Sequence, residues 1–442
     1  MGAWYGWSAG WDMRWMRAVV AMLTACGVFA GLLVREPRSG SPGADEVASI
    51  EWRARLALSS TVHLVGDLVI VVEPVGSSGR VTYAYDLGAA AGSADVWRRP
   101  GWVEPVETLD GTLLVTRYET GFSLVDPQTG LARWTNLDAD EVDEFGGVLI
   151  WNSCDEETGA GMCALSGLRL ADRAGEEVRR GLRPDWTIPV EADWSLDWPL
   201  EGVWRAPGTR FESLRAEPAP GGTPVLLPLR QDDRFEVVDP ATGRVVFGPA
   251  VESPWERILV LGRSVVRIAT RWDGVRCGYE VTATSLDETA VSWSRNDLDL
   301  GTAGGTGCQQ TVRIVAAAGV LWARVGGRPV LLDTAAGRER WVGQPDERVV
   351  ALSRSYAIVA TPAGRLRLVG LFTGHVQAEL PGTVDELSAV AVVAGGVIVE
   401  SGNGIWRCDL QCSRVFTGGW LLATDSSRAA VQWEHDVVVV PV

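Results

Sequence analysis

Two runs of this sequence have residue types that could bind an ion or a phosphate. Residues 138–144 (DADEVDE) offer carboxylates, but calcium loops need a Gly at the sharp turn and ligands at fixed offsets, so we interpret this run as a solvated loop. Residues 297–307 (DLDLGTAGGTG) are glycine-rich but lack the Lys of a phosphate-binding loop. We interpret them as a connection held by Cys308. No G-x-S-x-G nucleophile motif is present, so no Ser/His/Asp triad is predicted.

The cysteines favour disulfide chemistry over metal binding. Cys26 lies in an apolar run, and no C-x-x-C motif accompanies the scattered histidines His63, His375 and His435, which argues against a zinc site. An even number of cysteines at short separations is typical of disulfides in an oxidising compartment. We therefore predict three local structural disulfides, Cys154 with Cys163, Cys277 with Cys308, and Cys408 with Cys412.

The N-terminal region is typical of a membrane anchor. Residues 18–34 contain no charged side chain, and a helix of that length spans roughly 25 Å. Arg14 and Arg17 precede the run, which favours a cytoplasmic N-terminus. We expect residues 1–17 in the cytoplasm, a transmembrane signal anchor over 18–34, a polar linker over 35–46, and an extracytoplasmic domain over 47–442.

Two alternatives to the signal anchor stay open. Leu23-Thr24-Ala25-Cys26 resembles the bacterial lipobox, in which the Cys is acylated, although residues 27–34 remain apolar. A cleaved signal peptide is the other alternative, although no small-x-small site follows the apolar run. The predicted location is therefore the cell membrane with the C-terminal domain outside, or a lipoprotein acylated at Cys26.

The composition excludes one class of partner. The 442 residues carry a net charge of −16, and all 40 basic residues are Arg. An acidic surface repels polyanions, so we expect no nucleic-acid partner. The absence of Lys fits high-GC coding in a bacterium, and the 21 Trp residues lie mostly in strand-like runs.

Residues 125–134 (VDPQTGLARW) are the clearest copy of a repeated turn. Asp126 can accept backbone hydrogen bonds, Pro127 fixes the first turn position, and Gly130 tolerates a positive φ. Trp134 then lies on the next strand, where it can close a contact between sheets. Asp239 with Gly243 and Phe247, and Asp333 with Gly337 and Trp341, repeat the pattern. All the anchors, including weaker copies, are Asp86, Asp126, Asp172, Asp239, Asp287, Asp333, Gly370 and Asp409.

Anchors that recur about every forty residues, with several short strands in each interval, predict an all-β β-propeller of four-stranded antiparallel sheets. We expect eight blades, with seven or nine as alternatives, because the C-terminal tail together with Trp52 would make a ninth unit. Trp52 itself is predicted on the outer strand of the last blade, donated by the N-terminal end of the domain. Such a closure removes open sheet edges.

One interval between anchors is long, and we assign an insertion to residues 183–208 within it. This segment is rich in Trp and Pro. Exposed aromatic side chains are common anchors for partners, whereas Trp is more often buried. The segment is therefore a possible binding face or a cover over one end of the propeller, through Trp186, Trp194, Trp198 and Trp204.

At these turns the chain resembles the pyrroloquinoline-quinone-type (PQQ-like) repeat family, whose blades carry D-x-x-T-G followed by a Trp on the next strand. The residues that match are Asp126, Thr129, Gly130 and Trp134, then Asp239, Thr242 and Gly243, then Asp333, Gly337 and Trp341. The family includes quinone-dependent alcohol dehydrogenases and non-catalytic propellers, among them an envelope lipoprotein that helps assemble outer-membrane proteins.

The resemblance implies no catalytic site. Catalytic members carry an adjacent Cys–Cys pair against the quinone and Glu, Asn and Asp side chains on Ca²⁺. This sequence has no adjacent Cys pair, and none of its residues matches the calcium or base positions. We therefore expect no cofactor, no metal and no enzyme activity, but a protein-binding or scaffolding module of the cell envelope. A quinone-dependent dehydrogenase and a sensor or accessory protein of cell-wall or secretion machinery are the alternatives.

Overall fold

The structure is a computed structural model. The residues that it describes are 50–57, 59–76, 79–88, 95–108, 111–117, 121–139, 141–145, 147–154, 162–169, 183–191, 195–196, 204–205, 226–231, 234–251, 256–272, 277–287, 290–300, 316–317, 319–353, 355–393, 395–402, 404–425 and 427–442.

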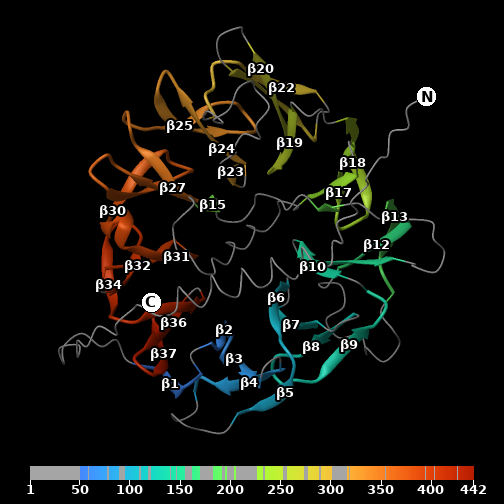
Figure 1. The fold of residues 1–442 in the computed structure, drawn as a ribbon, viewed down its shortest axis with the longest axis vertical. Coiled ribbons are helices and arrows are strands. Elements are labelled where there is room, and N and C mark those ends of the chain that lie inside the picture. Colours follow the sequence, from blue (N-terminus) through green and yellow to red (C-terminus); the bar gives the residue numbers. More distant parts are fainter. Residues whose placement is uncertain are drawn as a thin grey trace, which may run out of the picture. The chain divides into compact units, whose positions relative to one another are not determined.

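Residues 42–442 form one compact unit, in which nine antiparallel sheets follow one another around a ring (Figure 1). We number the sheets 1 to 9 in chain order and give the strands of each from the inner edge outward. Sheets 1 to 3 are β2(Thr61–Val65) β3(Leu68–Val75) β4(Gly79–Asp86) β5(Trp97–Pro100), then β6(Glu104–Thr108) β7(Gly111–Arg117) β8(Phe122–Val125) β9(Ala132–Asn136), then β10(Glu141–Phe145) β11(Val148–Cys154) β12(Met162–Arg169) β13(Trp186–Glu191).

Sheets 4 to 6 follow the same order. They are β14(Ser195–Leu196) β16(Leu227–Gln231) β17(Arg234–Asp239) β18(Arg244–Val251), then β19(Glu256–Leu261) β20(Ser264–Trp272) β21(Cys277–Ser285) β22(Val291–Arg295), then β23(Ala316–Ala317) β24(Val320–Val325) β25(Arg328–Asp333) β26(Glu339–Val342).

Sheets 7 to 9 complete the ring. They are β15(Trp204–Arg205) β27(Arg348–Leu352) β28(Tyr356–Ala360) β29(Arg365–Gly370) β30(His375–Thr383), then β31(Leu387–Val393) β32(Gly396–Ser401) β33(Gly404–Cys408) β34(Cys412–Thr417), then β35(Trp420–Thr424) β36(Arg428–Trp433) β37(Asp436–Pro441) β1(Trp52–Arg55).

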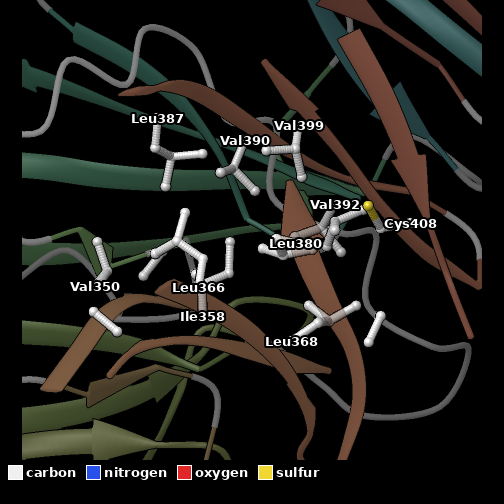
Figure 2. Packing of buried hydrophobic residues seen from close by; sticks show 14 residues of the cluster. Val350, Ile358, Leu366, Leu368, Leu380, Leu387, Val390, Val392, Val399 and Cys408 are labelled. Carbon is white, nitrogen blue, oxygen red and sulfur yellow. The ribbon is translucent and has the colours of Figure 1, made fainter. Parts of the chain in front are cut away.

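The second strand of each sheet is buried on both faces because it lies between two neighbouring sheets. In β3 the run Leu68–Val72 is buried at every position, and its Val and Ile side chains suit a crowded pleated surface. The core is consequently divided among the seams between sheets. Figure 2 shows the seam between sheets 7 and 8, where Leu366 and Leu368 of β29 pack with Val390 and Val399 of the next sheet.

The two ends of the described chain meet in sheet 9. Strand β1 pairs antiparallel with β37, in the register Trp52↔Val439. The expectation that the N-terminal strand completes the last blade from outside is confirmed, and Figure 1 shows β1 beside β37.

The propeller has nine blades, so the preferred count of eight is wrong. Asp172 lies outside the described residues, and each of the other seven anchors marks the connection between the two outermost strands of a sheet. Sheet 9 has no such connection, because its third strand β37 and its fourth strand β1 come from opposite ends of the domain. Counting turns therefore misses the blade at which the ring closes.

Part of the predicted insertion over 183–208 is regular blade structure. Trp186–Glu191 is β13, the outer strand of sheet 3, and it pairs with β12 over six residues. Ser195–Leu196 is β14, the inner strand of sheet 4. The excursion from the blade pattern begins after Leu196 and ends at Leu227, and within it β15 pairs with β27.

Among the described residues, no helix combines the length and the apolar character that crossing a bilayer requires. The predicted anchor at 18–34, the segment 1–17, the linker at 35–46 and Cys26 lie outside the described residues.

Candidate functional site

The turn that begins at Asp126 is closed by its own side chain and backbone. One carboxylate oxygen, Oδ1, accepts hydrogen bonds from the backbone N–H groups of Gln128 at 2.8 Å and Thr129 at 3.0 Å. The N–H of Gly130 donates to the carbonyl of Asp126 at 2.8 Å, and Gly130 has a φ of +67°. Asp and Gly are therefore required here by local geometry.

The second carboxylate oxygen of Asp126 binds Arg133 on the next strand. Arg133 donates from both Nε, at 2.9 Å, and Nη2 to Oδ2. Burial raises the pKa of Asp126, but the hydrogen bonds from Arg133 and from the turn backbone outweigh it, so the pKa lies below its ordinary value. Both oxygens are thus hydrogen-bonded, one within the turn and one to the strand that follows it.

A Trp from the preceding sheet covers this turn. Trp97, on β5 of sheet 1, donates from Nε1 to the carbonyl oxygen of Pro127 at 2.7 Å. Its ring lies against Gly130, where an added Cβ would lie 2.6 Å from the indole. The Gly is therefore needed both for its positive φ and for the close approach of the neighbouring blade.

The same arrangement recurs at two further seams. Trp186 donates to the carbonyl oxygen of Pro240 at 2.6 Å and lies against Gly243, and Trp293 donates to Thr334 at 2.8 Å and lies against Gly337. Sequence reasoning did not predict these pairings, and it placed Trp186 in a possible binding face. Its ring instead joins sheet 3 to sheet 4.

The carboxylates of Asp333 and Asp239, in the other two turns, also accept hydrogen bonds. Asp333 Oδ1 accepts from the backbone of Ala335 at 2.8 Å, and its Oδ2 accepts from Arg340 Nε at 3.0 Å and Nη2 at 2.7 Å. Asp239 Oδ2 accepts instead from the Thr242 hydroxyl at 2.9 Å. An Arg seven residues after the Asp is the sequence signal that would have identified the ion pairs.

Trp134 and Trp341 close seams through apolar packing. The Trp134 ring lies 5.3 Å from Phe122 in its own sheet and 5.7 Å from Trp151 of β11 in sheet 3. Trp341 packs in the cluster that contains Val349 and Leu371 of sheet 7. In sheet 6, Trp341 pairs with Leu331. The corresponding pair in sheet 7 is Ala378 with Leu368, so at the seam between sheets 7 and 8 an Ala takes the position of the Trp.

Two of the three predicted disulfides are present in the described part of the chain. Cys154 pairs with Cys163 across β11 and β12, and Cys408 pairs with Cys412 across the turn between β33 and β34. Cys412 Sγ lies 3.4 Å from the carbonyl oxygen of Glu379, at the seam where Ala378 takes the place of a Trp. Cys308 lies outside the described residues, as does the predicted pair with Cys277.

The remaining candidates from the sequence fall in different parts of the domain. Residues 141–144 of the acidic run belong to β10 and not to a solvated loop. Within the described residues, no three His, Cys, Asp or Glu side chains are grouped so that they could hold a metal ion. Trp194 and Trp198 lie outside the described residues, and Trp204 is placed by its backbone pairing with Leu352.

A scan against protein-family models and a search of curated proteins found no match to the chain. Among solved structures, the crystal structure of BamB from Moraxella catarrhalis aligns at 17% identity with a TM-score of 0.37, over 89% of this chain and 99% of that chain. The crystal structure of the computationally designed Ika8 protein aligns at 10% identity with a TM-score of 0.38, over the same shares of the two chains.

Proposed function

We propose that the chain is a membrane-anchored, extracytoplasmic propeller of the PQQ-like repeat type that binds other proteins of the cell envelope and catalyses no reaction. The observation that carries this proposal is the use of the repeated motif. Asp126 and Asp333 bind their own turns and a neighbouring Arg, and Trp97 and Trp293 bind the carbonyls of the following turn. In the motif that implies the family, the Asp therefore closes the turn of its own blade, and the Trp joins that blade to the next.

Support for protein binding comes from large apolar side chains left on turns that face solvent. Phe372 lies in the turn between β29 and β30 and is 74% exposed, and Leu410 in the corresponding turn of sheet 8 is 75% exposed. Phe372 takes the third place in its turn, where the turn at Asp126 has the polar Gln128. An exposed aromatic side chain at such a place is a suitable anchor for a partner.

In-cell cross-linking tests the binding proposal. A photoreactive residue in place of Phe372 is expected to capture a defined envelope protein, and the same residue in place of Gln128 serves as the matched control in another blade. Equal capture from both positions, or capture of abundant bystanders only, would contradict binding through this face.

A cofactor assay tests the catalytic alternative. Purified protein is given pyrroloquinoline quinone and Ca²⁺, with alcohols or sugars and a reducible dye. We expect no reduction of the dye. Tight, stoichiometric quinone binding with dye reduction would replace the scaffold proposal by a quinone-dependent dehydrogenase.

The location belongs to the same proposal and rests on the apolar run at 18–34 and on the disulfides Cys154–Cys163 and Cys408–Cys412. A thiol reagent that does not cross membranes is added to intact spheroplasts. We expect it to label these four cysteines only after reduction. Labelling that needs permeabilised membranes would place the propeller in the cytoplasm, and labelling of intact spheroplasts without reduction would show that the disulfides are absent from the native protein.

A further inference from the structure

Sheet 7 has an extra strand that its own blade does not supply. It is five-stranded, whereas the other eight sheets of the described ring have four strands each. The extra strand, β15, pairs antiparallel with β27 in the register Trp204↔Leu352 and Arg205↔Ala351. Figure 1 shows it on the inner side of the ring next to β27.

Strand β15 comes from sheet 4, not from a neighbour of sheet 7. The chain leaves sheet 4 at Leu196 and returns to it at Leu227, and the strands before and after this excursion pair with each other, with Leu196 opposite Leu229. Adjacent antiparallel strands need a connection of only about two to five residues. The excursion is therefore not needed to form sheet 4, and its described portion lies on the edge of another blade.

The side chains of Val349–Leu352 in β27 are buried in the core on both faces of the sheet. Val349 and Leu352 pack in the seam towards sheet 6, and Val350 and Ala351 pack in the seam towards sheet 8. What the inner edge of β27 offers to a pairing strand is its main chain. Recognition through main-chain hydrogen bonds accepts an extended segment with little demand on its sequence.

The described pairing of β15 with β27 covers Trp204 and Arg205. The inner strands of sheets 4 and 6, β14 and β23, likewise pair over two described residues each. A partner's extended segment that pairs with all of Arg348–Leu352 would make more main-chain hydrogen bonds than the described pair supplies, so it can compete for this edge.

We infer that the inner edge of β27 is an acceptor site for an extended polypeptide segment, and that β15 is an internal occupant which a partner's segment displaces by strand addition. This inference rests on the proposed protein-binding function and names the chemistry of the partner: a segment without regular structure of its own that pairs antiparallel with Arg348–Leu352.

Three variants of the full chain test the inference. W204P/R205P removes both β15 N–H groups and is expected to free the edge, whereas W204A/R205A keeps the main chain and serves as the matched control. R205C/A351C places two Cys residues directly opposite each other and is expected to lock β15 by a disulfide. The probe is a fluorescein-labelled peptide of residues 200–208 (LEGVWRAPG), and its binding is measured by fluorescence anisotropy.

We expect the peptide to bind W204P/R205P at least tenfold more tightly than it binds the wild type or W204A/R205A, and not to bind the locked variant until reductant is added. Hydrogen exchange gives an independent measure. The N–H of Ser353 donates to Tyr356 of β28, so the N–H of the preceding Leu352 points to β15, and its protection should fall in W204P/R205P and return with the peptide. Equal binding to the free and locked variants, or unchanged exchange at Leu352, would overturn the inference.

The cross-linking experiment separates this inference from the function on which it rests. If Phe372-directed capture of the partner is lost in the locked variant and kept in W204P/R205P, the acceptor edge is supported. If capture is the same in both variants, the edge is not the partner's site, while the scaffold function stands. If no variant captures a partner, the proposed function fails, and peptide binding alone then decides the edge.

Discussion

Gly130 satisfies two constraints that are separable by mutation. Its φ of +67° disfavours any L side chain, and the Trp97 ring lies where a Cβ would be. Gly66 has a φ of +57° but no heavy atom within 4 Å of the position of an added Cβ. The two glycines therefore share the left-handed backbone conformation, and they differ mainly in whether a side chain of the neighbouring blade lies against them.

Gly130→Ala is expected to destabilise the propeller more than Gly66→Ala. Both variants lose about 1–2 kcal/mol for the left-handed conformation, and overpacking against Trp97 adds about 1–3 kcal/mol for Gly130→Ala. The urea midpoints of the two variants measure the difference. Equal midpoints would mean that the Trp97 ring moves aside without cost.

The carboxylate of Asp126 makes the stability of its turn depend on pH. The pKa of Asp126 is lower in the folded protein than in the unfolded chain, where it is about 4. The ionised carboxylate therefore makes its full contribution to the free energy of unfolding above about pH 4, and this contribution is lost as the pH falls through the folded pKa. At pH 7, Asp126→Asn should cost about 1–2 kcal/mol, within the range for hydrogen bonds to charged groups at a partly exposed site.

The measurement for Asp126→Asn is urea unfolding from pH 7 to pH 3, in which the gap to wild type should narrow below about pH 4. Arg133→Met removes the other partner of the ion pair, and the double variant completes a cycle. If the difference in the free energy of unfolding between wild type and Asp126→Asn stays constant down to pH 3, the charge of the carboxylate is not its cause.

Strand β13 shows how an aromatic residue can be misjudged from its sequence neighbours. Trp186 lies in a Trp- and Pro-rich stretch that reads as irregular, yet Thr187–Val190 pair regularly with β12 and the indole joins sheets 3 and 4. A seam residue and a binding-face residue respond differently to truncation, because only the first contributes to folding.

Trp186→Ala should lower the free energy of unfolding by about 2–3 kcal/mol, less than the cost for a fully buried aromatic side chain, because Trp186 is only partly buried in its seam. Trp186→Phe should cost less, since it keeps the apolar ring but leaves the Pro240 carbonyl without its donor. Thermal unfolding of both variants checks the order. An unchanged midpoint for Trp186→Ala would restore the binding-face interpretation.

The repeated turns were predictable because Asp, Pro, Thr and Gly specify them within five residues. The partner of each turn was not predictable in this way. Trp97 and Gly130, like Trp293 and Gly337, are joined by the packing of one blade on the next, and no local rule states which aromatic ring faces which glycine. The pairing of Trp204 with Leu352 depends even more on the closed ring, because it joins sheets that are not neighbours in the chain.

At the level of the ring, closure depends on a strand that the chain supplies from its other end. Trp52 of β1 is buried, lies 5.5 Å from Tyr85 of sheet 1, and shares a cluster with Val437 and Val439 of sheet 9. Arg53 donates to Asp436 across the same strand pair. One side chain thus packs at the seam where the last blade meets the first.

Trp52→Ala should therefore cost about 3–5 kcal/mol, which thermal unfolding measures.

A variant that begins at residue 58 lacks β1, so it should expose the edge of β37 and self-associate. A variant that begins at residue 47 keeps β1 and is the matched control, which should stay monomeric. Size-exclusion chromatography and thermal unfolding distinguish them, and a synthetic peptide of residues 47–57 should restore the monomer by refilling the edge beside β37. If the shortened protein keeps the midpoint of the control and stays monomeric, the strand from the N-terminal end is dispensable and the ring is held by its other seams alone.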